Sequence, residues 1–149
     1  MMRVWIFFAG LFGAAGVALG AFHAHGLEGW LEDQQVSSAD IEYRLDLCET
    51  AVRYLLIQAV ALLGIVILSL TNRMIRTWAV VGVGFILGTL LFSGALLAMA
   101  FTGNKQFAHL APFGGITLIG SWLLFALSAF WYPRENLERF GEEDPSWPE

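Results

Sequence analysis

Four long apolar runs, separated by polar segments, are the main pattern of the chain. Crossing the roughly 30 Å hydrocarbon core of a bilayer takes about 20 apolar residues in a helix, and each run has about this length. The runs contain one charged residue, Arg53, near one end of the second run. The pattern predicts an all-α integral membrane protein, a four-helix bundle formed by residues 1–132. The predicted spans cover residues 4–22, 51–70, 78–101 and 112–131.

The polar segment between the first two runs carries two short amphipathic stripes. Apolar residues at three- and four-residue spacing are typical of a helix with one buried face, and Ser37 and Ser38 are suited to cap the second helix. We therefore expect two short helices that lie on the outer surface of the membrane and pack onto the ends of the spans. The apolar residues are Leu27, Trp30 and Leu31 in the first stripe, and Ile41, Leu45 and Cys48 in the second.

The two ends of the chain need separate interpretation. Met1-Met2-Arg3 before an apolar run resembles a secretory signal, but the 19 residues from Val4 to Phe22 exceed the usual apolar stretch of about 7–15. We interpret this run as a retained helix. Residues 133–149 are acidic and contain three prolines, which predicts a mobile cytoplasmic tail.

Basic residues in the short flanks predict the orientation, because they favour the cytoplasmic side. Four spans place both termini and the turn at residues 71–77 on one side, which holds five basic residues against three on the other. We therefore expect cytoplasmic termini. An aromatic belt is expected at the same boundary, from Trp5, Trp78, Trp131 and Tyr132. The basic residues are Arg3, Arg73, Arg76, Arg134 and Arg139 on the first side, and Arg44, Arg53 and Lys105 on the second.

Composition supports the membrane and excludes some chemistry. The chain is 57% hydrophobic and 14% charged, whereas about a quarter of residues are charged in soluble proteins. A net charge of −5 with scattered Lys and Arg argues against nucleic-acid binding. The single cysteine, Cys48, excludes an internal disulfide and a thiolate metal cage, and we expect it to be packed.

Small residues are dense in the first and third runs. Helices in a bilayer associate through close packing, and small residues four positions apart let two backbones approach. The pattern predicts a compact bundle, or a bundle with an additional self-association face, and it does not separate the two. The glycines that we expect to pack helices together are Gly13, Gly16, Gly20, Gly84 and Gly88.

Of the polar residues inside the predicted spans, we single out four, Gln58, Ser93, Thr117 and Ser121. Counting inward from the outer boundary at about 1.5 Å per residue places all of them roughly 8–13 Å deep. An unpaired amide in hydrocarbon is costly, so we expect Gln58 to hydrogen-bond across the bundle to at least one of the three hydroxyls. We interpret these residues as a structural polar layer that joins the helices. A path for an ion or a small molecule is the alternative.

The outer boundary carries a candidate ion pair and three histidines. Glu49 lies four residues before Arg53, the favoured order for an ion pair on a helix. His23, His25 and His109 are of the type that binds zinc or copper, but side chains two residues apart on a helix diverge. We expect these histidines to end helices, so no metal or other cofactor is predicted.

The spans contain no carboxylate and no histidine. A proton-coupled transporter usually carries a carboxylate within the membrane, and haem held between helices needs a histidine there. The sequence also contains no phosphate-binding loop and no catalytic-triad pattern. We therefore expect a protein that is not an enzyme.

Four segments in a fixed order carry a family resemblance: GAFHAHGL at 20–27, ETAVRYLLIQAVAL at 49–62, LFSGALLAMAFTG at 91–103 and APFGG at 111–115. Together they resemble the domain-of-unknown-function 423 family, over nearly all of the chain up to about Trp131. The resemblance implies four spans in a bacterial inner membrane and no established activity. The matching positions are Gly20, Ala21, Phe22, Ala24, His25, Gly26, Tyr54, Ser93, Gly94, Pro112, Gly114 and Gly115.

Two positions depart from the family pattern. His23 stands where the family usually has glycine, and Gln58 stands where it usually has histidine. If that histidine served proton or metal chemistry, Gln58 does not repeat it, because an amide neither titrates nor binds metal well. The departure favours a structural role for Gln58.

Three functions remain open. The first is a non-enzymatic accessory or scaffolding subunit of a membrane assembly, with the lipid bilayer and a homo-oligomer or larger complex as its surroundings. The second is a small oligomeric transporter or channel, lined by Gln58, Ser93 and Thr117. The third is a membrane metalloprotein or enzyme that uses the outer histidines and Glu49.

Cysteine labelling tests the predicted topology. On a background with Cys48 replaced, Ser38→Cys should react with a membrane-impermeant thiol reagent added to spheroplasts. Ser146→Cys should react only after lysis, because the basic residues hold the termini in the cytoplasm. Labelling of Ser146→Cys before lysis would establish the opposite orientation.

Overall fold

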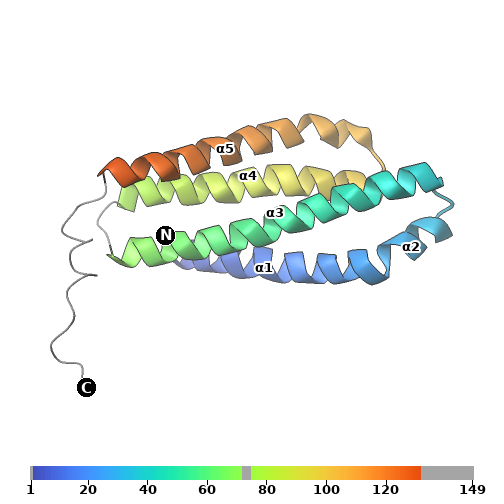
Figure 1. The fold of residues 1–149 in the computed structure, drawn as a ribbon, viewed down its shortest axis with the longest axis horizontal. Coiled ribbons are helices and arrows are strands. Elements are labelled where there is room, and N and C mark those ends of the chain that lie inside the picture. The colour runs from blue at the N-terminus through green and yellow to red at the C-terminus, as the bar shows by residue number, and fades with distance from the viewer. Residues whose placement is uncertain (1, 72–74, 132–149) are drawn as a thin grey trace, which may run out of the picture.

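The computed structural model describes residues 2–71 and 75–131, and every regular element in these ranges is a helix (Figure 1). The predicted acidic tail at residues 133–149 lies outside the described residues. In chain order the elements are α1 (Met2–His25), α2 (Leu27–Asp33), α3 (Ser38–Thr71), α4 (Ile75–Thr102), the 3₁₀ helix η1 (Lys105–His109), α5 (Ala111–Leu127) and the 3₁₀ helix η2 (Ser128–Trp131).

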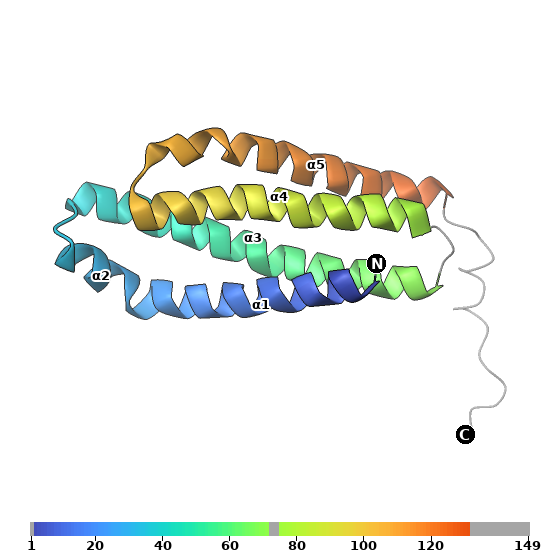
Figure 2. The ribbon, with the colours of Figure 1, turned by 180° about the vertical axis from the view of Figure 1, so that it is seen from behind.

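Four helical stretches, built on α1, α3, α4 and α5, are long and apolar enough to cross a membrane. This confirms the predicted all-α membrane bundle. The long helices pack in chain order: α1 lies on α3, α3 on α4, and α4 on α5. Two opposite views show α3 and α4 in the middle of the molecule, with α1 and α5 on its two flanks (Figure 1, Figure 2). The outward faces of α1 and α5 are therefore free to meet lipid or another protein.

α3 is longer than its predicted span. The second amphipathic stripe, expected as a separate surface helix, is the beginning of one continuous helix of 34 residues. Its length of about 51 Å exceeds the hydrocarbon thickness of about 30 Å, so its first turns extend beyond the apolar region. Nothing between Ser38 and Ala51 breaks a helix, and buried Ile41 and Cys48 pack against α2. The prediction of two separate short helices was correct only for α2.

Ser37 caps α3, as predicted for one of the two serines. Its Oγ accepts a hydrogen bond from the backbone N–H of Asp40 at 3.3 Å and donates one to the Asp40 carboxylate at 3.1 Å. The cap satisfies a backbone N–H that has no partner within the helix. Ser37 therefore fixes the point at which the chain turns from α2 into α3.

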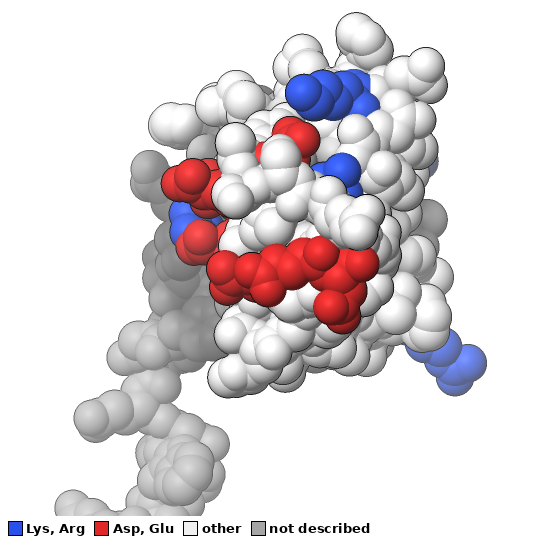
Figure 3. Space-filling model, turned by 90° about the vertical axis from the view of Figure 1, so that its right-hand side faces the viewer, with Lys and Arg blue, Asp and Glu red and all other residues white. Residues whose placement is uncertain are grey.

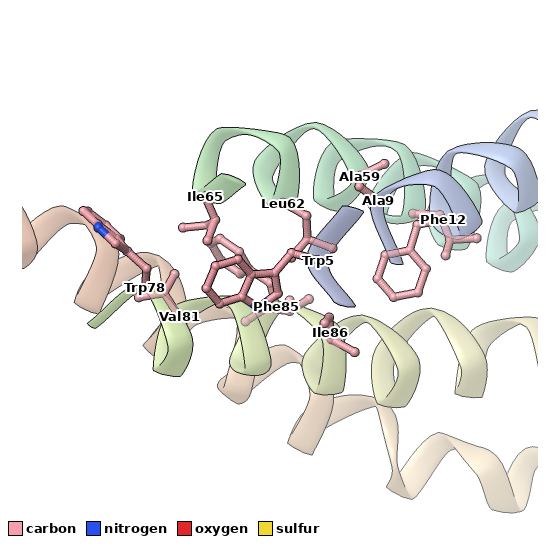
Figure 4. Close-up of a cluster of buried hydrophobic side chains, with 12 residues drawn as sticks. Trp5, Ala9, Phe12, Ala59, Leu62, Ile65, Trp78, Val81, Phe85 and Ile86 are labelled. Atoms are coloured by element: carbon pink, nitrogen blue, oxygen red, sulfur yellow. The ribbon is translucent and has the colours of Figure 1, made fainter. Parts of the chain in front are cut away.

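Two tryptophans belong to the apolar core at the end of the bundle that holds the N-terminus (Figure 4). Trp5 and Trp78 are only 3% and 1% exposed. A Cβ on Gly82 would lie 2.6 Å from the indole nitrogen of Trp5, so this glycine makes room for the ring. The expected aromatic belt is therefore wrong for both residues, because their rings face the core. The side chains of Trp131 and Tyr132 lie outside the described residues.

The five glycines expected to pack helices lie where α1 meets α3 or where α4 meets α5. A Cβ on Gly16 would lie 2.7 Å from Leu56, and a Cβ on Gly88 would lie 2.8 Å from Leu118. Gly84 faces Ser121 just as closely, and Gly20 and Gly13 face α3 at longer range. The tightest approach to backbone is at Gly114, where a Cβ would overlap the main chain of Phe92. The prediction named the α4 side of that interface and missed Gly114.

Leucine substitutions test this packing. Gly16→Leu and Gly88→Leu should each lower the free energy of unfolding by about 1–3 kcal/mol or more, because a branched side chain would force neighbouring helices apart. The matched control is Gly10→Leu, since no atom lies within 4 Å of a Cβ at that position. Thermal melting in mild detergent measures all three. Equal melting of Gly16→Leu and Gly10→Leu would contradict close packing at Gly16.

Candidate functional site

The buried polar side chains of the bundle are the first candidate site. Gln58 on α3 and Ser93 on α4 are each 1% exposed, and Thr89, four residues before Ser93 on α4, is fully buried. Ser121 is also buried, whereas Thr117 is only half-buried. The sequence reasoning missed Thr89. Its signal was the four-residue spacing from Ser93, which puts both hydroxyls on one face of α4.

The expected hydrogen bond from Gln58 across the bundle is not formed. Thr117 donates to the Phe113 carbonyl at 2.8 Å, and Ser121 donates to the Thr117 carbonyl at 2.7 Å. Helical Ser and Thr hydroxyls satisfy themselves in this way on the preceding turn, so they need no partner on another helix. Among the described residues, the buried Oε1 of Gln58 and Oγ of Ser93 have no hydrogen-bond partner.

The four predicted polar residues also do not share one layer. Phe92 lies opposite Gly114 and Gly84 lies opposite Ser121, so Ser121 is nine residues of α4 away from Ser93. That separation is about 13 Å along the helix. The depth estimate counted α4 and α5 from the ends of their apolar runs. The actual register of the two helices is offset, because α4 continues well beyond the level at which α5 begins.

A smaller polar group remains at the centre, where α3 packs on α4. The rings of Tyr54 and Phe92 lie 4.7 Å apart between their centroids, which fixes the register of the two antiparallel helices. Gln58 follows Tyr54 by one turn, which places it near the level of Thr89, within about half a turn. We call Gln58, Thr89 and Ser93 the polar centre. Its amide and hydroxyl groups are able to form hydrogen bonds but do not titrate, so the polar centre can hold water or an uncharged polar group.

The outer end of the bundle holds the other predicted residues. Arg53 donates a hydrogen bond to Glu49, and both side chains are more than half exposed. Such an exposed pair contributes little stability. His23 and His25 lie in the last turn of α1, where their side chains diverge, and His109 ends η1. Within residues 2–71 and 75–131, no three His, Cys, Asp or Glu side chains are placed to hold a metal ion.

The fold and the buried polar centre define a small multi-pass membrane protein. The family described as "Protein of unknown function (DUF423)" matches residues 19–115, which contain all four resembling segments. A UPF0382 membrane protein of Staphylococcus haemolyticus is 33% identical over 129 residues, covering 87% of this chain and 97% of the relative. The chain belongs to this family of membrane proteins of unknown function.

Relatives from other bacteria are also membrane proteins of the UPF0382 group. The UPF0382 membrane protein YwdK of Bacillus subtilis is 30% identical over 133 residues, covering 88% of this chain and 99% of the relative. The UPF0382 inner membrane protein YgdD of Escherichia coli is 29% identical over 136 residues, covering 91% and 95%. No solved structure matches the chain significantly. The relatives therefore match most of the chain, and the function must be argued from this structure.

Substitution of Gln58 tests whether the polar centre is structural. Gln58→Leu should change the free energy of unfolding by less than about 1 kcal/mol, because it removes a buried oxygen that has no partner and fills the space with an apolar group. Gln58→His should also fold, since the family resemblance implies a histidine at this position. Denaturant unfolding in detergent micelles measures both, with Thr89→Val as the neighbouring control. A loss of several kcal/mol in Gln58→Leu would show that the amide makes an essential hydrogen bond.

Proposed function

We propose that the protein is a non-enzymatic accessory or scaffolding subunit of a larger assembly in a bacterial inner membrane, with both termini in the cytoplasm. The observation that carries this proposal is a row of small residues on the outward face of α1. Gly10, Ala14 and Ala18 follow one another at four-residue spacing, and all three are exposed. We call them the outer stripe of α1.

The outer stripe is separate from the glycines that hold α1 in the bundle. Gly13, Gly16 and Gly20 face α3, where added atoms would meet Ala59, Leu56 and Val52 respectively. At 3.6 residues per turn, the outer stripe lies roughly a third of a turn around the helix from that face. α1 thus has two small-residue faces, and the bundle uses one of them.

A face of small residues like the outer stripe is suited to pack against another helix. Small residues in line leave a shallow groove in which another backbone can approach closely, and this close packing is what drives association between helices in lipid. Lipid chains gain no comparable contact from a groove of this kind. The stripe therefore favours a transmembrane helix of another subunit, and a second copy of this chain is an outcome that the test must distinguish.

A small transporter or channel is the second candidate. The observation in its favour is the polar centre, where Gln58 Oε1 and Ser93 Oγ are buried without a partner among the described residues. Free hydrogen-bonding capacity of this kind suits water or a polar solute within the bundle. A path would need this capacity to continue toward both ends of the bundle, and Thr89 already donates to the Phe85 carbonyl of its own helix. We therefore rank this function second.

Co-purification with matched variants tests the proposal. The full-length chain, tagged and extracted in mild detergent, should retain a membrane partner in constant stoichiometry. Gly10→Leu should lose that partner, because leucine fills the groove, while its own melting stays unchanged. Gly120→Leu on α5 is the control, since that glycine is also exposed with open space around it, and its neighbours four residues away are Ile116 and Leu124.

Three results are informative. Loss of a different membrane protein from Gly10→Leu alone supports a subunit of a mixed assembly. Conversion of a dimer to a monomer by Gly10→Leu assigns the stripe to self-association. Identical composition and size of the wild-type, Gly10→Leu and Gly120→Leu preparations would reject the outer stripe as a docking face.

A further inference from the structure

A small pocket opens at the end of the bundle where α2 and the start of α3 lie. It has a volume of about 100 Å³ and lies between the first turns of α3 and the end of α4 with η1. Its lining is mostly polar, and it includes two cations. The lining residues are Asp40, Tyr43, Arg44, Met99, Gly103 and Lys105.

Arg44 is held in the pocket by the turn that follows α4. Gly103 has a φ of +68°, a left-handed conformation that glycine adopts readily. A Cβ on Gly103 would overlap the guanidinium of Arg44, so the glycine also gives the arginine its place. The guanidinium of half-buried Arg44 thus lies against this turn, and Lys105 follows Gly103 by two residues in the same wall.

Among the described residues, neither of the two pocket cations forms an ion pair, although many carboxylates lie at the same end of the molecule. This end of the molecule carries seven acidic residues, and Figure 3 shows their side chains gathered across it. The ion pair in the described part of the chain joins Arg53 to Glu49, and neither Arg44 nor Lys105 takes part in one there. The acidic residues of this end are Glu28, Glu32, Asp33, Asp40, Glu42, Asp46 and Glu49.

Asp40 is the carboxylate that lines the pocket, and it already accepts a hydrogen bond. It stands four residues before Arg44, the spacing of an intrahelical ion pair. Its Oδ2 instead accepts a hydrogen bond from Ser37 Oγ at the N-cap of α3. The pocket lining therefore holds two positive charges, of Arg44 and Lys105, against the one negative charge of Asp40, and this balance favours an anion.

The height of the pocket suits a lipid headgroup. Arg44 precedes the first residue of the apolar run, Ala51, by seven residues, or about 10 Å along α3. Headgroups occupy the outer roughly 5–8 Å on each side of the hydrocarbon core, within reach of long Arg and Lys side chains. Tyr43, exposed beside the pocket, is a residue type that favours this zone.

We propose that this pocket binds a phosphate group, with the Arg44 guanidinium and the Lys105 ammonium as its ligands. Arginine presents several N–H donors in a fixed plane that matches phosphate oxygens, and lysine adds a point charge. The phosphate of a membrane phospholipid and free inorganic phosphate share this chemistry, and the position at headgroup height favours the phospholipid. The site is independent of the outer stripe of α1 and of the accessory role.

Thermal melting of the full-length protein in a neutral detergent tests the site. Dioleoylphosphatidylglycerol, inorganic phosphate and the phosphate-free lipid monogalactosyldiacylglycerol are added in separate titrations. Phosphatidylglycerol should raise the melting temperature of the wild type with saturation, because a ligand that binds only the folded state stabilises it. Arg44→Gln and Lys105→Gln should each raise the half-saturating concentration about tenfold or more, as expected for the loss of one charge-assisted hydrogen bond.

Arg53→Gln is the matched control. It removes one positive charge from the same end, outside the pocket, so it should leave the titration unchanged if the effect is not a general attraction of anionic lipid. A response to inorganic phosphate as strong as the response to the lipid would assign the site to free phosphate. An equal response to the galactolipid, or equal titrations for Arg44→Gln, Arg53→Gln and the wild type, would overturn the proposal.

Discussion

Lipid chains are as apolar as leucine, so helices inside a bilayer gain little from burying one apolar side chain against another. The described bundle depends on close backbone approach instead. α1 meets α3 at Gly16, and α4 meets α5 at Gly88 and Gly114, where a Cβ would overlap the neighbouring helix. These contacts determine the chain-order arrangement of the four helices. They also fix the register of α4 against α5, on which the position of every buried polar group depends.

The hydrocarbon of the bilayer also explains how the polar side chains inside the bundle are hydrogen-bonded. A hydroxyl in hydrocarbon needs an acceptor, and a helical Ser or Thr can find one on the preceding turn. Thr89, Thr117 and Ser121 do so, whereas the buried Oγ of Ser93 has no partner among the described residues. A glutamine side chain does not have this local solution to the same extent, and Gln58 keeps an oxygen without a partner among the described residues. The unused hydrogen-bonding capacity of the polar centre therefore lies on the Gln58 amide oxygen and the Ser93 hydroxyl.

The sequence predicted the fold well because the bilayer imposes one length and one composition on each span. The four apolar runs correspond to four helices, and Ser37 begins α3 as its hydrogen-bonding chemistry suggests. The incorrect predictions concern how deep in the bundle a residue lies and which way its side chain points. The length of α3 was underestimated because polar residues that extend a helix out of the membrane resemble those of a separate surface helix. The level of Ser121 was misplaced because an apolar run does not show where its helix sits against a neighbour.

The facing of Trp5 and Trp78 could not be predicted for a related reason. Both stand at a span end, where a tryptophan at the interface and a tryptophan in the core have the same neighbours in sequence. Only the third dimension separates the two, since Gly82 lies far from Trp5 in the chain and directly beneath its ring in the bundle. The phosphate pocket is likewise invisible in sequence, because Arg44 and Lys105 belong to different helices and meet through the turn at Gly103.

Residues that folding does not account for indicate where a function can lie. A glycine within a helix is less favourable than alanine by about 1 kcal/mol, and at Gly16 the contact with α3 offsets that cost. Gly10 has no atom of its own chain within 4 Å of a Cβ, so the bundle gives it no compensation. Gly120 is equally open, but only Gly10 continues into a row with Ala14 and Ala18. A contact with a helix of another chain would offset the unfavourable helix propensity of Gly10. A groove of small residues contributes to association only when another helix packs into it.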